Sequence, residues 1–467
     1  MQKLRPTAQS PLVNLPPGQS NLAASREIVA WLRDPLQFFQ ERHDRYGPIW
    51  RTRLLNKPTV VMLGPDANRF VLGTHLQLFS SRDGWGDSLY NLIGEGLSLQ
   101  DGARHHERRI QLQPAFHQRA VGKYFAAMER LTHAHLEGWF QQGDLALFDG
   151  FKSLTFAIIC EVLLGVSEGP LYRALEHHFE PFNAGLFSPV MLDVPWLPFG
   201  RAIRARAALA VTLRAIIAER RGGPAGDDAL GMLLQATDGA DAPLSDTEIV
   251  SQLLLLLWAG HDTVTSLLTW TIHEIQRQPA LLAALRAEQA AVLGNTAFAL
   301  EHLRQLPLLD RVLREAERRH PPASGGFRGV RETFEWGGYT VPKGWLVMYS
   351  IAWTHHQPDL FADPLRFDPA RFAAPRNEGR HAYSVIGFGG GPRICIGLAL
   401  AMMEMRVILS VLLRRAEITV LPSQDFTAIA TPTKRPKDKL KVHIARHQPS
   451  PRPAAPQLLH TVDAGAP

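Results

Sequence analysis

The chain has 467 residues, of which 45% are apolar and 20% are charged, a balance typical of a soluble globular protein with a large core. Its 37 glycines and 34 prolines are too few for a collagenous or low-complexity chain. Only two cysteines are present, Cys160 and Cys395, which excludes a disulfide framework and any four-thiolate metal site.

The net charge is +6, from 50 Lys and Arg against 44 Asp and Glu, and no dense basic run occurs. This small excess argues against nucleic acid and favours an acidic protein partner. The most apolar segment, Leu253 to Ile272, carries His261 and Asp262 at its centre, which favours a buried helix over a membrane span. With neither a signal peptide nor a membrane anchor in residues 1–24, we expect a cytoplasmic protein with reduced thiols.

In chain order, residues 26–46 predict an early helix that breaks near Pro35. Two strands are expected next, at 48–55 and 58–63, joined by a hairpin at Asn56 and Lys57. Helical periodicity then runs with interruptions from 104 to 221, and the glycine-rich stretch 222–226 ends it.

A long central helix is predicted next. Ser245 and Glu248 form a Ser-x-x-Glu pattern before an apolar run, the signature of a capping box, and no breaker follows before Pro279. A helix of about 30 residues would span ~45 Å and must cross the middle of the protein. Short strands are expected at 329–334, 339–341 and 345–351, and a final helix from about Cys395 to Arg414.

These elements predict a mainly α protein with a minor β-sheet region, because no repeat or linker divides the chain. We expect a proline-rich N-terminal segment over residues 1–24, one domain over 25–446, and a disordered C-terminal tail over 447–467.

The segment from Phe388 to Gly397 carries the clearest chemical signal. Its glycines let the backbone approach a ligand closely, and the expected helix start would favour a thiolate at Cys395, with Arg393 adding positive charge. A phosphate cradle is one alternative, although the third glycine of a dinucleotide fingerprint is missing. An inert buried thiol is another, and it is our interpretation of Cys160.

The spacing Phe-x-x-Gly-x-Arg-x-Cys-x-Gly resembles the haem-binding signature of the cytochrome P450 superfamily. The resemblance implies that Cys395 is the thiolate ligand of haem iron. It implies that Phe388 packs against the ligand loop, that Arg393 pairs with a haem propionate, and that Gly391 and Gly397 belong to the same cofactor site. Many relatives have proline where this chain has Gly387, and this difference is expected to loosen the entry of the loop.

The middle of the long helix reads Ala259-Gly260-His261-Asp262-Thr263. From the residues alone, the Thr263 hydroxyl could bond its own helix while Asp262 lies in a buried salt bridge, or Gly260 and Thr263 could open a groove for dioxygen and water. The segment resembles the acid–alcohol pair of the same superfamily. The resemblance implies that Ala259 and Gly260 border the haem, that Thr263 orients water and oxygen, and that Asp262 relays protons.

A Glu-x-x-Arg pair at Glu315 and Arg318 would by itself indicate a solvated surface pair. Followed by His320 and two prolines, it resembles the Glu-x-x-Arg helix of the superfamily. The resemblance implies a structural triad with Arg371 as its third member.

Haem propionates need cationic partners. The segment 102–109 resembles the superfamily's early helix, with His105 in the place of a tryptophan and Arg109 in the place of the propionate-binding arginine. Arg328 also matches a propionate-binding position.

The resemblance covers roughly residues 25 to 446 and implies a haem-thiolate monooxygenase. Its cofactor would be haem b, with dioxygen as co-substrate and electrons from NAD(P)H through a reductase and a separate ferredoxin or flavodoxin. It would hydroxylate or epoxidise a hydrophobic small molecule such as a fatty acid, a terpenoid or steroid, or a polyketide-like compound. We expect a monomer, and a basic docking face that includes Arg104, Arg108, Arg119 and Lys123, although these residues could equally be scattered surface charges.

Other activities stay open at this point. A non-oxygenase or peroxide-using haem-thiolate enzyme is disfavoured by the Asp262–Thr263 pair. A Cys–His hydrolase would use Cys395 as its nucleophile, but no base-bearing motif accompanies it. A haem-binding sensor without turnover is the third alternative.

Overall fold

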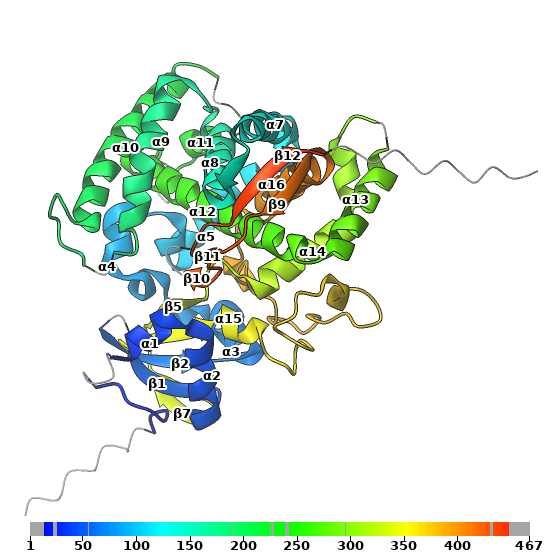
Figure 1. The fold of residues 1–467 in the computed structure, drawn as a ribbon. Coiled ribbons are helices and arrows are strands. Elements are labelled where there is room, and N and C mark those ends of the chain that lie inside the picture. The colour runs from blue at the N-terminus through cyan, green and yellow to red at the C-terminus, as the bar shows by residue number, and fades with distance from the viewer. Residues whose placement is uncertain are drawn as a thin grey trace, which may run out of the picture.

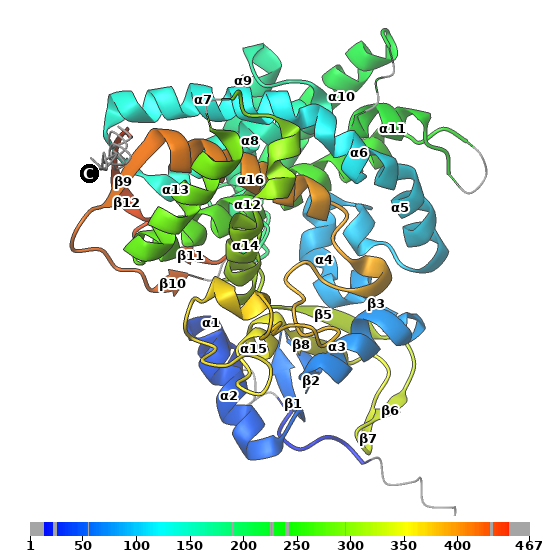
Figure 2. The same ribbon diagram turned by 90° about the vertical axis from the view of Figure 1, so that its right-hand side faces the viewer.

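The computed structural model describes residues 14–21, 26–54, 56–188, 190–224, 226, 228–238, 242–294, 296–429 and 433–447. Helices form most of it, and a five-stranded sheet lies at one end of the helical body (Figures 1 and 2). The predicted fold class, mainly α with a minor sheet, is confirmed. Apart from His447, the tail expected to be disordered lies outside the described residues.

The N-terminal elements follow the sequence pattern. The early helix is divided at Asp34 into α1 (Glu27–Arg33) and α2 (Pro35–Tyr46), because Pro35 takes the first position of the second helix. The predicted hairpin pairs β1 (Ile49–Leu54) with β2 (Lys57–Met62), and Asn56 adopts a positive φ of 59° between them. The Pro17 carbonyl accepts a hydrogen bond from Arg51, so the proline-rich segment reaches this sheet.

The sheet continues with strands from later in the chain, in the order β1-β2-β8-β5-β3. β8 (Leu346–Ser350) pairs in parallel with β2, whereas β5 (Gly325–Val330) is antiparallel to β8 and to β3 (Phe79–Ser80). Along β8, Leu346 and Met348 join one apolar cluster while Val347 and Tyr349 join another, so the sheet is buried on both faces.

The single strand expected at 329–334 is wrong. β5 ends at Val330, and β6 (Phe334–Trp336) pairs with β7 (Tyr339–Val341) in a separate hairpin. Residues 331–333 form the bend between the two sheets. An alternating pattern cannot reveal such a bend, because the strands on both sides of it have the same composition.

The helical body comprises α3 (Pro65–Arg69), α4 (Ser81–Ile93), α5 (Gly102–Phe116), α6 (Gln118–Val121), α7 (Phe125–Gln142), α8 (Leu147–Leu164), α9 (Gly169–Gly185), α10 (Pro198–Arg221), α11 (Ala229–Gln235), α12 (Asp246–Gln276), α13 (Pro279–Leu293), α14 (Pro307–Arg319), α15 (Ile351–His355) and α16 (Leu398–Arg415). Small sheets are formed by β4 (Asp144–Ala146), β12 (Lys441–Arg446) and β9 (Ala416–Val420), and by β10 (Ala428–Ile429) and β11 (Arg435–Pro436).

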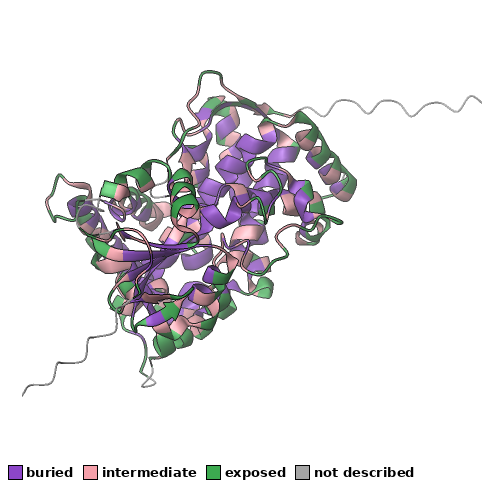
Figure 3. Ribbon diagram, turned by 90° about the horizontal axis from the view of Figure 1, so that it is seen from below, coloured by how far each residue is buried: buried purple, intermediate pink, exposed green. Residues whose placement is uncertain are grey.

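The predicted long helix is α12, which has 31 residues. Ser245 caps it through the Glu248 amide, and the Glu248 side chain returns a contact to the Ser245 backbone, so the capping box is confirmed. Most of its residues are buried, and buried residues fill the interior of the helical body (Figure 3). Among the described residues, no helix combines the length and the apolar character that a membrane span requires.

Candidate functional site

Cys395 lies in an irregular loop between a helical turn at Gly391–Arg393 and the start of α16. The Cys395 amide donates to the Phe388 carbonyl at 2.8 Å, which closes the loop. Gly391 has a positive φ of 59°, and a Cβ on it would lie 2.3 Å from the Leu72 carbonyl oxygen. Only glycine therefore allows the loop to pack against the backbone at Leu72.

The expectation that Cys395 begins the final helix is wrong, because α16 starts three residues later, at Leu398. Burial raises the pKa of the Cys395 thiol, while the amide of Gly397 and the guanidinium of Arg109 act to lower it. The side chain is nevertheless solvent-accessible and lines a hollow of about 640 Å³ together with Arg109. The thiol is thus surrounded by protein and still open to a space inside the molecule.

The middle of α12 is also open. Ala259 is exposed and Thr263 is half-buried, although 249–257 and 264–275 on either side of this segment are buried. The Thr263 hydroxyl donates to the Ala259 carbonyl at 2.8 Å, as Thr265, Thr269 and Thr271 do to the preceding turn. Thr265, Thr269 and Thr271 are fully buried. Thr263 therefore differs from them in the accessibility of its hydroxyl and not in its hydrogen bond.

Asp262, the residue before Thr263, is buried in a polar cluster. Its Oδ2 accepts from Asn183 of α9 at 2.7 Å, and its Oδ1 lies 3.0 Å from Nδ1 of His261. Burial acts to raise its pKa, but these contacts hold the pKa below the ordinary value. Sequence reasoning missed Asn183, because nothing in its own segment marks it as a partner of α12.

Gly260 lies beside α8. A Cβ on Gly260 would lie 2.6 Å from Cδ1 of Ile159, so the close packing of α8 against α12 requires glycine at this position. The space that the sequence predicts beside Gly260 is occupied by Ile159, whereas Ala259 and Thr263 are accessible.

The four residues expected to bind propionates form one cluster. Arg393 contacts Asp101 at 2.8 Å, and burial, followed by the nearby Arg328, lowers its pKa to about 10. His105 is buried on α5, and burial together with Arg393 and Arg109 lowers its pKa to about 4. Its imidazole is therefore neutral at physiological pH.

This cluster has fewer negative charges than positive ones. Among the described residues, Asp101 is the only carboxylate in contact with Arg109, Arg328 or Arg393. Arg328 is 7% exposed, and its Nε has no hydrogen-bond partner within the described part of the chain. Buried guanidinium groups with too few anions fit a ligand that brings carboxylates of its own, as a porphyrin with two propionates does.

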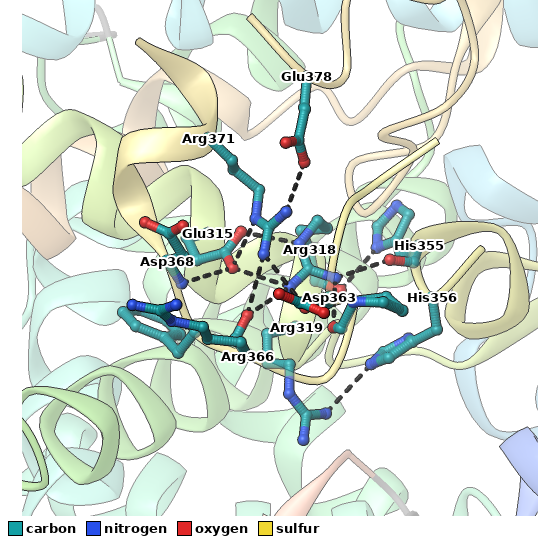
Figure 4. Close-up of polar contacts among 12 residues, drawn as sticks. Glu315, Arg318, Arg319, His355, His356, Asp363, Arg366, Asp368, Arg371 and Glu378 are labelled. Carbon is teal, nitrogen blue, oxygen red and sulfur yellow. Dashed lines mark hydrogen bonds and ion pairs between the residues drawn. The ribbon is translucent and has the colours of Figure 1, made fainter. Parts of the chain in front are cut away.

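Glu315, Arg318 and Arg371 meet in a fully buried network (Figure 4). Glu315 accepts from both guanidinium groups, at 2.7 Å and 2.8 Å from Arg318 and at 3.0 Å from Arg371. Arg371 also pairs with Glu378, so two buried cations face two carboxylates. The sequence pattern pointed to three of these residues and missed Glu378.

His355 connects this network to the cysteine loop. Its Nδ1 lies 3.1 Å from the Arg318 carbonyl, and its Nε2 accepts the Ile386 amide at 2.9 Å, two residues before Phe388. The ring must be neutral to make both contacts, and burial followed by Arg318 lowers its pKa to about 3. His355 therefore ties α14 to the segment that enters the loop.

Of the basic face expected around α5, only Arg108 is wrong, because it is 4% exposed. Arg104, Arg119 and Lys123 are exposed, and Arg104 is paired with Glu95 and Glu248. The hollow at Cys395 instead has Arg109, Arg314 and Arg406 in its wall, and a second hollow of about 350 Å³ beside it is lined by Arg119.

Comparisons with known proteins agree with this geometry. The family model described as cytochrome P450 matches residues 16–443. The putative cytochrome P450 120 of Synechocystis is 36% identical and covers 92% of this chain and 96% of its own. The taxane 13-alpha-hydroxylase of Taxus cuspidata is 31% identical and covers 85% and 84%. A solved structure of retinoic acid bound cyanobacterial CYP120A1 matches with a TM-score of 0.86 and 34% identity, over 93% of this chain and 100% of that one.

The His355 contacts predict a pH-dependent stability. The unfolded chain protonates this imidazole near its ordinary pKa of 6.5, whereas the folded chain keeps it neutral down to about 3. The unfolded state therefore binds more protons below pH 6.5, so the contribution is complete above that pH and is lost as the pH falls toward 3. The loss from this group is about 1.4 kcal/mol per pH unit.

We expect denaturant unfolding of His355→Gln between pH 6.5 and 4 to show a smaller slope of the unfolding free energy against pH than the unmodified protein. The difference should correspond to nearly one proton fewer taken up on unfolding. His381→Gln is the control, because His381 is exposed. Equal slopes in His355→Gln and the unmodified protein would show that His355 is not held neutral.

Proposed function

This chain belongs to the cytochrome P450 family and is a cytochrome P450 monooxygenase, and from that premise we propose that it hydroxylates a hydrophobic isoprenoid small molecule at a haem ligated by Cys395. Members of the family bind haem, which leaves a Cys–His hydrolase without support. The observation that carries the proposal is the Cys395 thiol, which is enclosed by protein yet accessible and lies within reach of the charge of Arg109.

The substrate class is supported by the relatives. Their names include retinoic acid, taxane, abscisic acid and beta-amyrin, which are all isoprenoid molecules. The ring centroids of Trp258 and Phe187 lie 5.9 Å apart, and Ala259 and Ala323 are small and exposed. These residues around the open part of α12 suit such ligands.

When bound, the haem supplies the activation of dioxygen. Arg328, Arg109 and the neutral His105 would hold its carboxylates, and Asp101 keeps Arg393 in place beside them. The Thr263 hydroxyl would hold water at the accessible surface of α12. Its present hydrogen-bond partner is the Ala259 carbonyl of the same helix.

Protons would reach this water from Asp262. His261 lies beside the Asp262 carboxylate, and Nε2 of His261 lies 3.0 Å from the Lys152 carbonyl. The Lys152 side chain pairs with Glu180, which is exposed. These groups form a polar route from the buried carboxylate toward the surface of α8 and α9.

Electrons would come from an acidic ferredoxin or flavodoxin docked over the hollow at Cys395. Arg109 and Arg314 in its wall supply the positive charge, since Arg406 is paired there with Asp310, and Arg119 extends the charge into the neighbouring hollow. Charge steering of this kind weakens with added salt. We expect the rate of electron transfer to fall as ionic strength rises, and a rate independent of salt would contradict docking at this face.

Replacement of Cys395 by alanine should abolish the red-shifted Soret band of the reduced, carbon monoxide-bound protein, because that shift requires thiolate ligation. Absorption spectra of the purified variant measure this directly. Cys160→Ala is the control, since Cys160 is fully buried inside α8 and should leave the band in place. A retained band in Cys395→Ala would reject the proposed ligand.

Replacement of Thr263 by alanine should divert reducing equivalents to hydrogen peroxide, because the hydroxyl that holds the proton-delivering water is lost. The measurement is product formed and peroxide released per NAD(P)H consumed, with a loss of coupling of roughly tenfold or more. Thr271→Ala serves as the control, because Thr271 makes the same type of helix contact but is fully buried. Unchanged coupling in Thr263→Ala would reject the role.

The substrate class is tested by titrating the purified haem protein with retinoic acid and with a straight-chain fatty acid of the same carbon number. We expect the isoprenoid acid to shift the Soret band and to yield a hydroxylated product. A shift and product with the fatty acid alone would overturn the isoprenoid assignment while leaving the haem ligand untouched.

A further inference from the structure

Glu317 on α14 packs against the entry of the cysteine loop. Its neighbours Glu315 and Arg318 are committed to the network with Arg371, whereas Glu317 is directed at Gly387. A Cβ on Gly387 would lie 2.4 Å from Cγ and 2.7 Å from Oε1 of Glu317. Gly387 has no left-handed backbone angle, so the reason for glycine here is the Glu317 side chain and not the turn.

The Glu317 carboxylate also lies beside the backbone of the loop. The amides of Gly387 and Phe388 lie close enough to the Glu317 carboxylate to act to lower its pKa. Phe388 in turn accepts the Cys395 amide through its carbonyl at 2.8 Å. A proline at position 387 would have no amide N–H, so this contact requires a residue other than proline there.

Glu317 is close enough to Cys395 for its charge to act on the thiol. Both residues line the same hollow, and the carboxylate acts to raise the pKa of Cys395. Burial raises the pKa of Glu317 itself to about 7, while the two loop amides and Arg314 act to lower it. The Glu317 side chain fills the space beside Gly387, and this contact opposes the loosening of the loop that the sequence predicts at this position.

We propose that Glu317 is a positioning residue for Cys395: its carboxylate fixes the Gly387–Phe388 entry of the loop and places a negative charge beside the iron ligand. The proposal rests on the proposed function, in which Cys395 binds the haem iron. A negative charge near the ligand favours the oxidised iron, so the residue would set the reduction potential as well as the loop geometry.

The potential of Glu317→Gln is the first test. Glutamine keeps the shape and one acceptor oxygen, so folding should be retained while the charge is lost. Measured well above the pKa of Glu317, the one-electron equilibrium should shift toward the reduced iron by roughly tenfold, the size of an interaction that moves a pKa by one unit. Glu301→Gln is the control, because Glu301 is exposed. A potential equal to that of the unmodified protein would overturn the electrostatic role.

The contact with Gly387 is tested by a double-mutant cycle. Gly387→Ala alone forces a Cβ against Glu317 and should lower the unfolding midpoint of the full-length protein and speed the loss of haem. Adding Glu317→Ala vacates that space, so the double variant should recover part of both losses. Additive losses would overturn the positioning role.

The two proposals fail in different ways. If Cys395 is not the iron ligand, the thiolate spectrum survives in Cys395→Ala and the proposed function falls. The unfolding midpoints of the Gly387 and Glu317 variants report their contact whether or not sulfur binds iron. Recovery in the double variant together with an unchanged potential in Glu317→Gln would leave a packing contact only and would overturn the proposal as stated.

Discussion

The placement of one sulfur atom depends on buried charges that lie outside its own loop. The segment that carries Cys395 has little regular structure, so it is fixed by what it packs against. Glu315 holds Arg318 and Arg371 with no exposure to solvent, and through the Arg318 carbonyl the network reaches His355 and the segment entering the loop. Removing Glu315 would leave Arg318 buried without a carboxylate partner, so the network depends most on this residue.

Such networks are expensive to bury and contribute more to a unique geometry than to stability. Here the network fixes both the two arginines and the loop that they contact. Arg318 and Arg371 are held in position because the backbone carbonyls of Ala362, Pro364 and Arg366 accept further hydrogen bonds from their guanidinium groups. The long loop 356–390 is thereby held in one conformation, although it contains only a single short helical turn, at Pro369–Phe372. A ligand atom at its end can then be placed reproducibly against a rigid cofactor.

Local patterns in the sequence predicted those features whose causes are local. The capping box at Ser245 and the breaker at Pro279 bound α12 because helix ends depend on a few adjacent residues. The glycines around Cys395 likewise marked a loop. Asn183, His355 and Glu317 escaped notice because each acts on a partner from a distant element, and no spacing within one segment records that meeting.

The same limit explains the errors. The pattern predicts a helix from about Cys395, and free helix amides there would favour a thiolate; the helix begins at Leu398, and the Gly397 amide acts to lower the thiol pKa without a helical turn. Arg108 was assigned to the surface by its charge, whereas tertiary packing buries it beside Gln111. Gly260 was read as an opening toward oxygen, and its actual neighbour is Ile159 of another helix.

The parallel pairing of β2 with β8 has a consequence for biosynthesis. Thr59 lies beside Leu346, so the first two strands leave the ribosome long before their partner is translated. Until then the hairpin of β1 and β2 presents an unsatisfied edge and an apolar face to solvent. Closure of distant ends is slow, and the nascent polypeptide must therefore be shielded from aggregation through most of its synthesis.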